Sequence, residues 1–274
     1  MNLLWAVLVV VAVTAVAVAA MLLVRRTAPD GSYFEDGDRA AGVFGVISTG
    51  FAVLLGFVIF LAFQSYDTSR SGAEAEAQIV IQQFETAQFM PRAVRARLSG
   101  ELVCYARVVV AQEWPKMESG TLGNAFNPWG ISMFRTMQTV EPKTNAEQTA
   151  FGKWFDQRSD RENARADRVH GAEGVIPRPL WIALLAMAAL ILLFMLFFAD
   201  SGERAVVQAT MMGGVAVVVS SMLLVLFFLA NPYQSGPGGL QPTAMERTLH
   251  LLDAGARTVG IGPAHLCDAR GAAT

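Results

Sequence analysis

The sequence predicts an all-α integral membrane protein, with four transmembrane helices in a 2+2 arrangement around a long helical insert. Of the 274 residues, 53% are hydrophobic and only 16% are charged, whereas soluble domains carry about a quarter charged residues. The apolar residues concentrate in four runs that contain no charged side chain, residues 3–24, 43–63, 180–199 and 205–230. At about 1.5 Å per helical residue, each run can cross a hydrocarbon core of roughly 30 Å.

The first transmembrane pair occupies residues 1–63, and its two spans flank a short acidic loop, "TAPDGSYFEDGDRA". The first run ends in "AVAVAA", which leaves a cleaved signal peptide as an alternative. Its apolar stretch is longer than that of a signal peptide and no positive charge precedes it, so a retained anchor is favoured.

The insert covers residues 64–179 and reads as helical. The segment "SGAEAEAQIVIQQFETAQF" continues the second span as an amphipathic helix. A second helix is expected with Pro91 at its first position, because its apolar residues recur at helical spacing: Val94, Leu98, Leu102, Tyr105 and Val109. A third helix begins at Thr144, with Glu147 at the capping-box position. The glycine- and proline-rich "PKMESGTLGNAFNPWG" between them predicts a loop.

The second pair occupies residues 180–230, with only "DSGER" between its spans, and residues 231–274 form a C-terminal tail. An even number of spans places the N-terminus, the insert and the tail on one side of the membrane. Basic residues near the span ends do not decide which side. The short-loop side carries Arg25, Arg26, Arg39 and Arg204, and the insert side carries Arg70, Arg165, Arg168, Arg178 and Arg247.

Cys104 and Cys267 lie far apart in the sequence, which allows either one disulfide or two thiols. We expect thiols, because Cys104 lies in an apolar helical pattern where a small hydrophobic residue fits.

Signals for catalysis are scarce. The three histidines, His170, His250 and His265, show no metal-ligand spacing with cysteine or glutamate. Phosphate-binding, dinucleotide-binding and Gly-x-Ser-x-Gly motifs are absent from the sequence. The net charge of −2 gives no reason to expect a nucleic-acid partner. We therefore expect no enzyme, no cofactor and no bound metal.

The second span has two features that bear on function. It is rich in small residues that allow close helix approach: Gly42, Gly45, Ser48, Gly50, Ala52 and Gly56. Thr49, Val53 and Phe57 lie at i, i+4 and i+8, so they share one helical face. Periodicity alone leaves open whether this face lines a pore or packs against lipid and neighbouring helices, and packing is the more common role.

Four stretches resemble bestrophins. "LLGFVIFLAFQSYD" is similar to their second-span signature, and "LSGELVCYARVVVAQEWPKM" resembles the helix that follows in bacterial relatives. "GVIPRPLWIALL" is similar to the entry into their third span, and "NPYQSGPGGLQP" resembles the stretch after their fourth. The Glu113–Met117 and Asn231–Tyr233 motifs further resemble bacterial proteins called bestrophin-like. The resemblance extends in order from about Gly42 to Pro242.

The resemblance implies an anion-permeable channel in a bacterial inner membrane, built as a ring of identical subunits, typically five. In that family the second spans line the pore, and an apolar neck narrows it. Alignment on Gly56–Phe57 carries this neck onto Thr49, Val53 and Phe57. The resemblance also implies that the insert and both termini are cytoplasmic, although Arg25 and Arg26 favour the reverse.

Two departures from the family pattern qualify these expectations. The family's arginine in the polar end of the second span is missing, since Gln64, Ser65 and Tyr66 stand there. No carboxylate occurs in residues 234–238, where calcium-gated members carry an acidic cluster, so calcium gating is not expected. The alternative function is a non-conducting membrane scaffold or sensor whose helical insert binds a partner protein.

Overall fold

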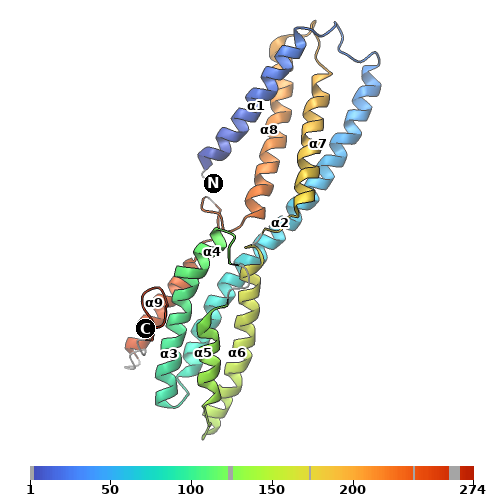
Figure 1. The fold of residues 1–274 in the computed structure, drawn as a ribbon. Helices are drawn as coiled ribbons and strands as arrows, with labels where there is room; N and C mark the ends of the chain where they lie inside the picture. The colour runs from blue at the N-terminus through green and yellow to red at the C-terminus, as the bar shows by residue number, and fades with distance from the viewer. Residues whose placement is uncertain (1–2, 123–125, 173, 237, 259–265) are drawn as a thin grey trace. The chain divides into compact units, whose positions relative to one another are not determined.

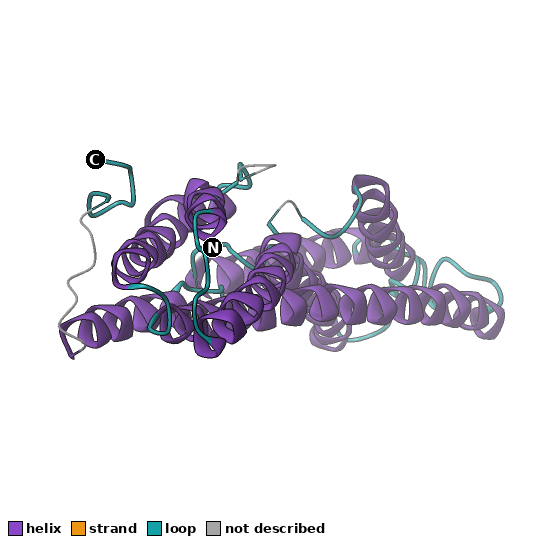
Figure 2. Ribbon diagram, turned by 90° about the horizontal axis from the view of Figure 1, so that it is seen from below, coloured by secondary structure: helices purple, strands orange, loops and turns teal. Residues whose placement is uncertain are grey.

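The computed structural model describes residues 3–122, 126–172, 174–236, 238–258 and 266–274. Within these ranges the chain is helical, without a strand, and the only β-type pairing is an isolated bridge between Cys267 and Ala273 (Figure 2). The all-α prediction is confirmed. The chain divides into two units. Unit 1 holds residues up to Gln64 and Val175–Asn231, and unit 2 holds Ser65–Gly174, Pro232–Gln234 and the residues from Gly239 onward.

Unit 1 contains four helices that are long and apolar enough to cross a membrane (Figure 1). They are α1 (Leu3–Arg25), the first part of α2 (Gly37–Ala87), α7 (Arg178–Leu196) and α8 (Ala205–Ala230). They contain the predicted spans, except that α7 ends three residues before the predicted boundary at residue 199. Phe51, Leu55 and Val58 of α2 pack with Leu184 and Ile191 of α7 in one apolar cluster.

The two short loops of unit 1 are joined by polar contacts around Asp200. The Asp200 carboxylate accepts hydrogen bonds from the backbone N–H groups of Gly31, at 3.0 Å, and Gly202, at 2.7 Å. These bonds to the charged form hold the pKa of Asp200 below its ordinary value. The Arg25 guanidinium donates to the carbonyl oxygen of Ser201 at 3.0 Å. The loop after α1 and the loop between α7 and α8 therefore form one connected structure.

Unit 2 is built from the second part of α2 and from shorter helices. These are α3 (Arg92–Val108), a π-helical turn (Val109–Glu113), α4 (Trp114–Glu118), α5 (Pro128–Gln138), α6 (Asn145–His170) and α9 (Thr243–Thr258). The predicted continuation of the second span is confirmed, because α2 runs unbroken to Ala87. The apolar stripe predicted on α3 contributes to the core of unit 2.

Two predicted helix starts in unit 2 have different outcomes. Thr144 caps α6 as predicted: its hydroxyl accepts from the Glu147 N–H, and the Glu147 carboxylate accepts from the Thr144 N–H, both at 3.2 Å. Pro91 lies one position earlier than predicted, at the N-cap of α3 with φ −49° and ψ 144°. Its extended ψ keeps it outside the helix.

The predicted loop over residues 115–130 is wrong in part, because α4 and the start of α5 lie in it. Asn127 caps α5, since its side-chain oxygen accepts from the Trp129 N–H at 3.2 Å. Pro128 follows at the first helical position, where its missing N–H costs nothing. An Asn-Pro pair that suggests a turn thus begins a helix.

The expectation of free thiols is also wrong: Cys104 of α3 and Cys267 of the tail form a disulfide. The two residues are 163 positions apart in sequence, so local helical patterning around Cys104 carries no information about its partner.

Gly72 sets the contact between α2 and α6. A Cβ atom at this position would lie 2.5 Å from the backbone nitrogen of Arg168 and 2.8 Å from the carbonyl oxygen of Ala164. Only glycine lets the two helix backbones approach this closely. The contact brings the buried side chains of α6 within reach of α2.

Candidate functional site

The three residues predicted to line a pore lie on the outward face of α2 in unit 1. Thr49 is exposed, Val53 is 68% exposed and Phe57 is 63% exposed. On the opposite face of the same helix, Phe51 is 4% exposed and Leu55 is fully buried. The helix therefore uses one face for its own subunit and leaves the face with Thr49, Val53 and Phe57 without a partner in the described chain.

The glycines of the second span do not mediate helix contacts within unit 1. A Cβ atom added at Gly42, Gly45, Gly50 or Gly56 would meet no atom within 4 Å. The predicted close approach at these residues is thus not made inside the subunit. Small residues in a membrane helix allow another backbone to approach closely, so this face suits contact with a second protein surface as well as with lipid.

Beyond Gln64, α2 belongs to unit 2 and carries polar side chains. Asp67 and Glu74 are exposed, and Glu74 accepts from the Arg70 guanidinium at 3.3 Å. This part of α2 therefore presents charged side chains at its surface.

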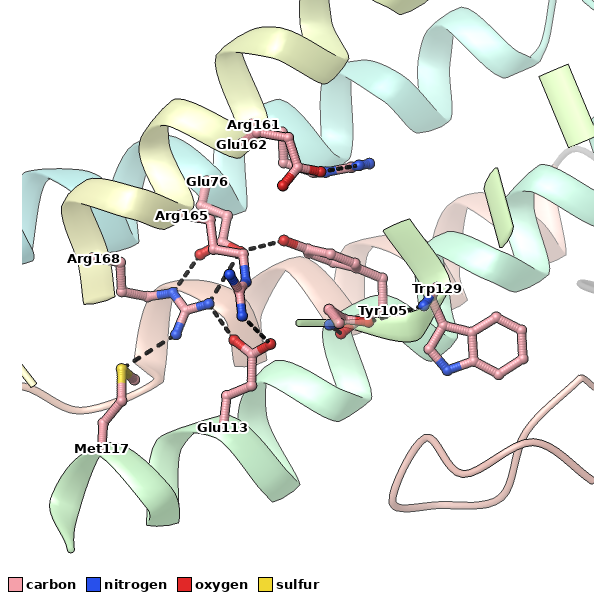
Figure 3. A network of polar contacts seen from close by, with 10 residues as sticks. Glu76, Tyr105, Glu113, Met117, Trp129, Arg161, Glu162, Arg165 and Arg168 are labelled. Carbon is pink, nitrogen blue, oxygen red and sulfur yellow. Dashed lines mark hydrogen bonds and ion pairs between the residues drawn. The ribbon is translucent and has the colours of Figure 1, made fainter. Parts of the chain in front are cut away.

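A buried charge network occupies the interior of unit 2, centred on Arg168 of α6 (Figure 3). The Arg168 guanidinium pairs with both Glu76 of α2 and Glu113 of the π-helical turn. Arg165 pairs with Glu113 at 3.1 Å, and the Tyr105 hydroxyl donates to Glu76. Two arginines and two glutamates thus balance each other in charge, and the pairs join three helical segments that are distant in sequence.

The two motifs that resemble bestrophin-like proteins meet at Arg168. From the first, Met117 accepts a hydrogen bond through its sulfur from Arg168 Nη1 at 3.4 Å, and the Trp114 ring lies 5.7 Å from the guanidinium carbon. From the second, the Tyr233 hydroxyl donates to the Arg168 carbonyl oxygen, and its ring packs edge-on against Trp114 at 5.5 Å. The two motifs therefore pack together around Arg168.

The environment of this network shifts the pKa of its members. Burial opposes the charge of Arg168, but the attraction of Glu76 and Glu113 outweighs it and raises the pKa of the guanidinium. Burial raises the pKa of Tyr105 well above its ordinary value, and burial raises the pKa of Tyr233 to about 12. Both tyrosines are thus neutral hydrogen-bond donors at physiological pH.

A second buried arginine, Arg161, lies two turns earlier on α6. Its Nη1 donates to the side-chain oxygen of Gln83 at 2.7 Å, and its guanidinium carbon lies 4.8 Å from the centre of the Tyr105 ring. On α3, the buried Glu101 accepts from the hydroxyls of Ser132 and Thr136 at 2.7 Å and 2.9 Å. These contacts fix α5 and α6 against α2 and α3.

The π-helical turn that carries Glu113 ends two residues before Pro115. Proline provides no N–H and its ring clashes with the carbonyl four residues earlier, so a regular α-helix cannot pass through it unchanged. Widening of the helix just before the proline relieves this conflict. It also directs Glu113 into the interior, where it meets Arg165 and Arg168.

The sequence analysis missed this network, although α6 carried a signal for it. Its buried residues follow alternating steps of three and four: Ala150, Trp154, Gln157, Arg161, Ala164 and Arg168. Arginines in such a seam must have buried acidic or polar partners. The sequence analysis considered Arg165 and Arg168 only as basic residues near a span end.

An apolar groove completes the description of unit 1. An apolar groove of about 660 Å³ runs along α1, α7 and α8, with Val9, Trp181 and Phe227 among its lining residues. Among the residues that the structure describes, no group of three or more His, Cys, Asp or Glu side chains is arranged to hold a metal ion.

Comparison with known proteins gives a family and a fold. The family model "Bestrophin-like domain" matches residues 11–245, and no curated protein matches significantly. A crystal structure of a mutated bacterial bestrophin homologue from Klebsiella pneumoniae is similar with a TM-score of 0.65 at 11% identity, covering 91% of this chain and 98% of that one. A second mutant of that homologue gives 0.66 at 10% identity, with 91% and 97% covered.

A mutated protein described only as a membrane protein gives a TM-score of 0.67 at 10% identity, covering 89% of this chain and 98% of that one. At these identities the structures establish the fold alone. The family match covers most of the chain, and the four apolar helices agree with it. This membrane protein belongs to the bestrophin-like family.

Proposed function

We propose that the protein is a homo-oligomeric ion channel whose pore is lined by the outward face of α2. The observation that carries the proposal is the exposure of Val53 and Phe57 on a helix whose other face is fully packed. A ring of copies around a common axis, five as the family resemblance implies, would cover this face. The remaining apolar surface, including the groove along α1, α7 and α8, would be covered by the acyl chains of a bacterial inner membrane.

In this proposal Phe57 and Val53 form an apolar constriction and Thr49 adds a hydroxyl on the same face. A narrow apolar ring controls conduction because water and ions leave it when it is too narrow to hydrate. The exposed glycines permit the close helix approach that a narrow ring needs. The family resemblance implies small anions as the permeant ions. It also implies a cytoplasmic insert, which the Cys104–Cys267 disulfide opposes, but conduction does not depend on orientation.

The test is ion flux in liposomes that contain the purified protein, with Phe57→Ala as the variant. We expect anion flux from the natural protein and faster flux from Phe57→Ala, because the smaller side chain widens the constriction. Leu193→Ala is the matched control, since Leu193 is 54% exposed on α7 and lies outside the proposed pore. No flux from any of the three proteins, with assembly verified by native mass spectrometry, would contradict the proposal and favour a non-conducting scaffold.

A second candidate function is a cation channel with the same pore. The exposed carboxylate of Asp67 on α2, together with the missing family arginine, favours cations, because acidic rings attract them. Reversal potentials under a salt gradient separate the two. A potential near that of chloride supports the anion channel, and a potential near that of sodium supports the cation channel.

A further inference from the structure

The C-terminal segment from Leu266 to Thr274 is fastened to α3 by a disulfide. The sulfur atoms of Cys104 and Cys267 are bonded, and both residues are buried, at 2% and 7% exposure. The segment has no helix, and one isolated bridge between Cys267 and Ala273 is its only β-type pairing. Its attachment to the rest of unit 2 therefore depends on side-chain contacts and on the Cys104–Cys267 disulfide.

Several further contacts show that the segment fits its place closely. Trp129 donates its indole N–H to the Gly271 carbonyl oxygen at 2.7 Å, and Gln112 donates to the Arg270 carbonyl oxygen at 2.8 Å. Arg107 donates to the Asp268 carbonyl oxygen at 3.1 Å. Gly271 has φ +80°, and a Cβ atom there would lie 2.6 Å from a Val108 methyl group. The fold thus holds the two sulfur atoms together through independent interactions.

A buried disulfide of this kind carries information about its compartment. Structural disulfides persist where the surroundings are oxidising, as in the bacterial periplasm, whereas the cytoplasm keeps thiols reduced. Because two spans separate the insert from the tail, both lie on the same side of the membrane. The short loops at residues 26–36 and 197–204 lie on the opposite side. Both cysteines are therefore exposed to a single compartment during folding.

The basic residues near the span ends are compatible with this assignment. The positive-inside rule counts lysines and arginines in short loops and within about 20 residues of the span ends. The short loops and their flanks carry Arg25, Arg26, Arg39 and Arg204. The insert and the tail carry a similar number near their span ends: Arg70, Arg165, Arg168, Arg178 and Arg247. The rule therefore leaves the orientation open, and the disulfide carries the inference.

We infer that unit 2 faces the oxidising, extracytoplasmic side of the membrane, where the Cys104–Cys267 disulfide is formed and fixes the C-terminal segment. The bond forms by thiol–disulfide exchange with an oxidised dithiol protein of that compartment. The two cysteine thiols lose two electrons and two protons, and the disulfide of the oxidant is reduced to a dithiol. This orientation reverses the one implied by the family resemblance and does not depend on whether the protein conducts ions.

Orientation is tested by labelling single cysteines with a membrane-impermeant maleimide on intact spheroplasts. Glu118→Cys reports on unit 2 and Glu35→Cys on the first short loop, because both positions are exposed. Each is introduced together with Cys104→Ala and Cys267→Ala. We expect at least tenfold stronger labelling of Glu118→Cys than of Glu35→Cys, and equal labelling after permeabilisation. Stronger labelling of Glu35→Cys would overturn the inference.

A second measurement uses the natural cysteines and does not rely on variants. Thiols are trapped in living cells by acid and alkylation, and the cysteine peptides are identified by mass spectrometry. We expect a linked Cys104–Cys267 peptide in ordinary cells and alkylated peptides in cells that lack the periplasmic dithiol oxidase. Alkylated peptides in both strains would overturn the inference. A disulfide that forms equally in both strains would also overturn it, and would indicate a cytoplasmic redox switch instead.

Discussion

The two units of this protein differ in where their characteristic side chains lie, buried in unit 2 and exposed on α2 in unit 1. Unit 2 pairs its buried arginines with glutamates, closes its tail with a disulfide and packs its tryptophans Trp114, Trp129 and Trp154 in one core. Unit 1 packs one face of α2 and leaves the other open, with Val53 and Phe57 more than half exposed. An interior tied together by buried ion pairs and a disulfide is adapted to stability. The exposed apolar face of α2 is open to lipid or to a second copy of the chain, and we propose that the function of the protein lies there.

The largest effect is expected in unit 2, from removal of the charge at its centre. Arg168→Met leaves the buried carboxylates of Glu76 and Glu113 without their main partner, and breaking such a pair costs about 3–5 kcal/mol. Thermal unfolding in detergent measures the loss. Arg70→Met is the control, because its ion pair with Glu74 is exposed and such pairs contribute at most about 1 kcal/mol. Equal effects of the two variants would refute the structural role of the network.

A paired comparison on α2 tests the difference between its two faces. Leu55→Ala removes a fully buried side chain from the apolar cluster of unit 1, which should cost about 2–4 kcal/mol of stability. Phe57→Ala, two residues later, should change the unfolding temperature of the isolated subunit less, since the residue is 63% exposed within the described chain. If Phe57→Ala also destabilised the assembled form, the ring would contribute to contacts between copies rather than to an open pore.

The stability of unit 2 should fall at alkaline pH because its buried tyrosines must stay protonated. Burial in the folded protein raises the pKa of Tyr233 to about 12, compared with 10.0 for an ordinary tyrosine. Below pH 10 the hydroxyl is protonated in both states and the full stabilisation is present. Between pH 10 and about 12 the unfolded state loses the proton while the folded state keeps it, so stability falls by roughly 2–3 kcal/mol over this range. Tyr233→Phe should flatten this part of the profile, and an unchanged slope would contradict the assignment.

The sequence predicts the membrane part of this fold well, because a run of some twenty apolar residues has few alternatives to a spanning helix. It also predicts the start of α6, since Thr144 and Glu147 carry a local capping signal. Both features depend on residues that are close in sequence. The exposure of the face with Thr49, Val53 and Phe57 agrees with the helical periodicity, although its role in a pore stays a prediction.

The features that the sequence did not predict depend on distant partners. Glu76 and Arg168 are 92 residues apart, and Cys104 and Cys267 are 163 apart. The local sequence around each of these residues does not show that its partner lies close to it in the fold. The short helix that starts at Pro128 was missed for another reason: Asn-Pro is typical both of turns and of helix starts, and tertiary packing of Trp129 and Met133 in the core decides between them.

The most direct test is the structure of the assembled protein in a lipid nanodisc by single-particle electron cryomicroscopy. The proposal predicts a ring of copies with a continuous axial opening, in which Thr49, Val53 and Phe57 of every copy point toward the axis and Phe57 marks the narrowest apolar point. A ring without an opening, or one in which these three side chains contact lipid, would contradict it.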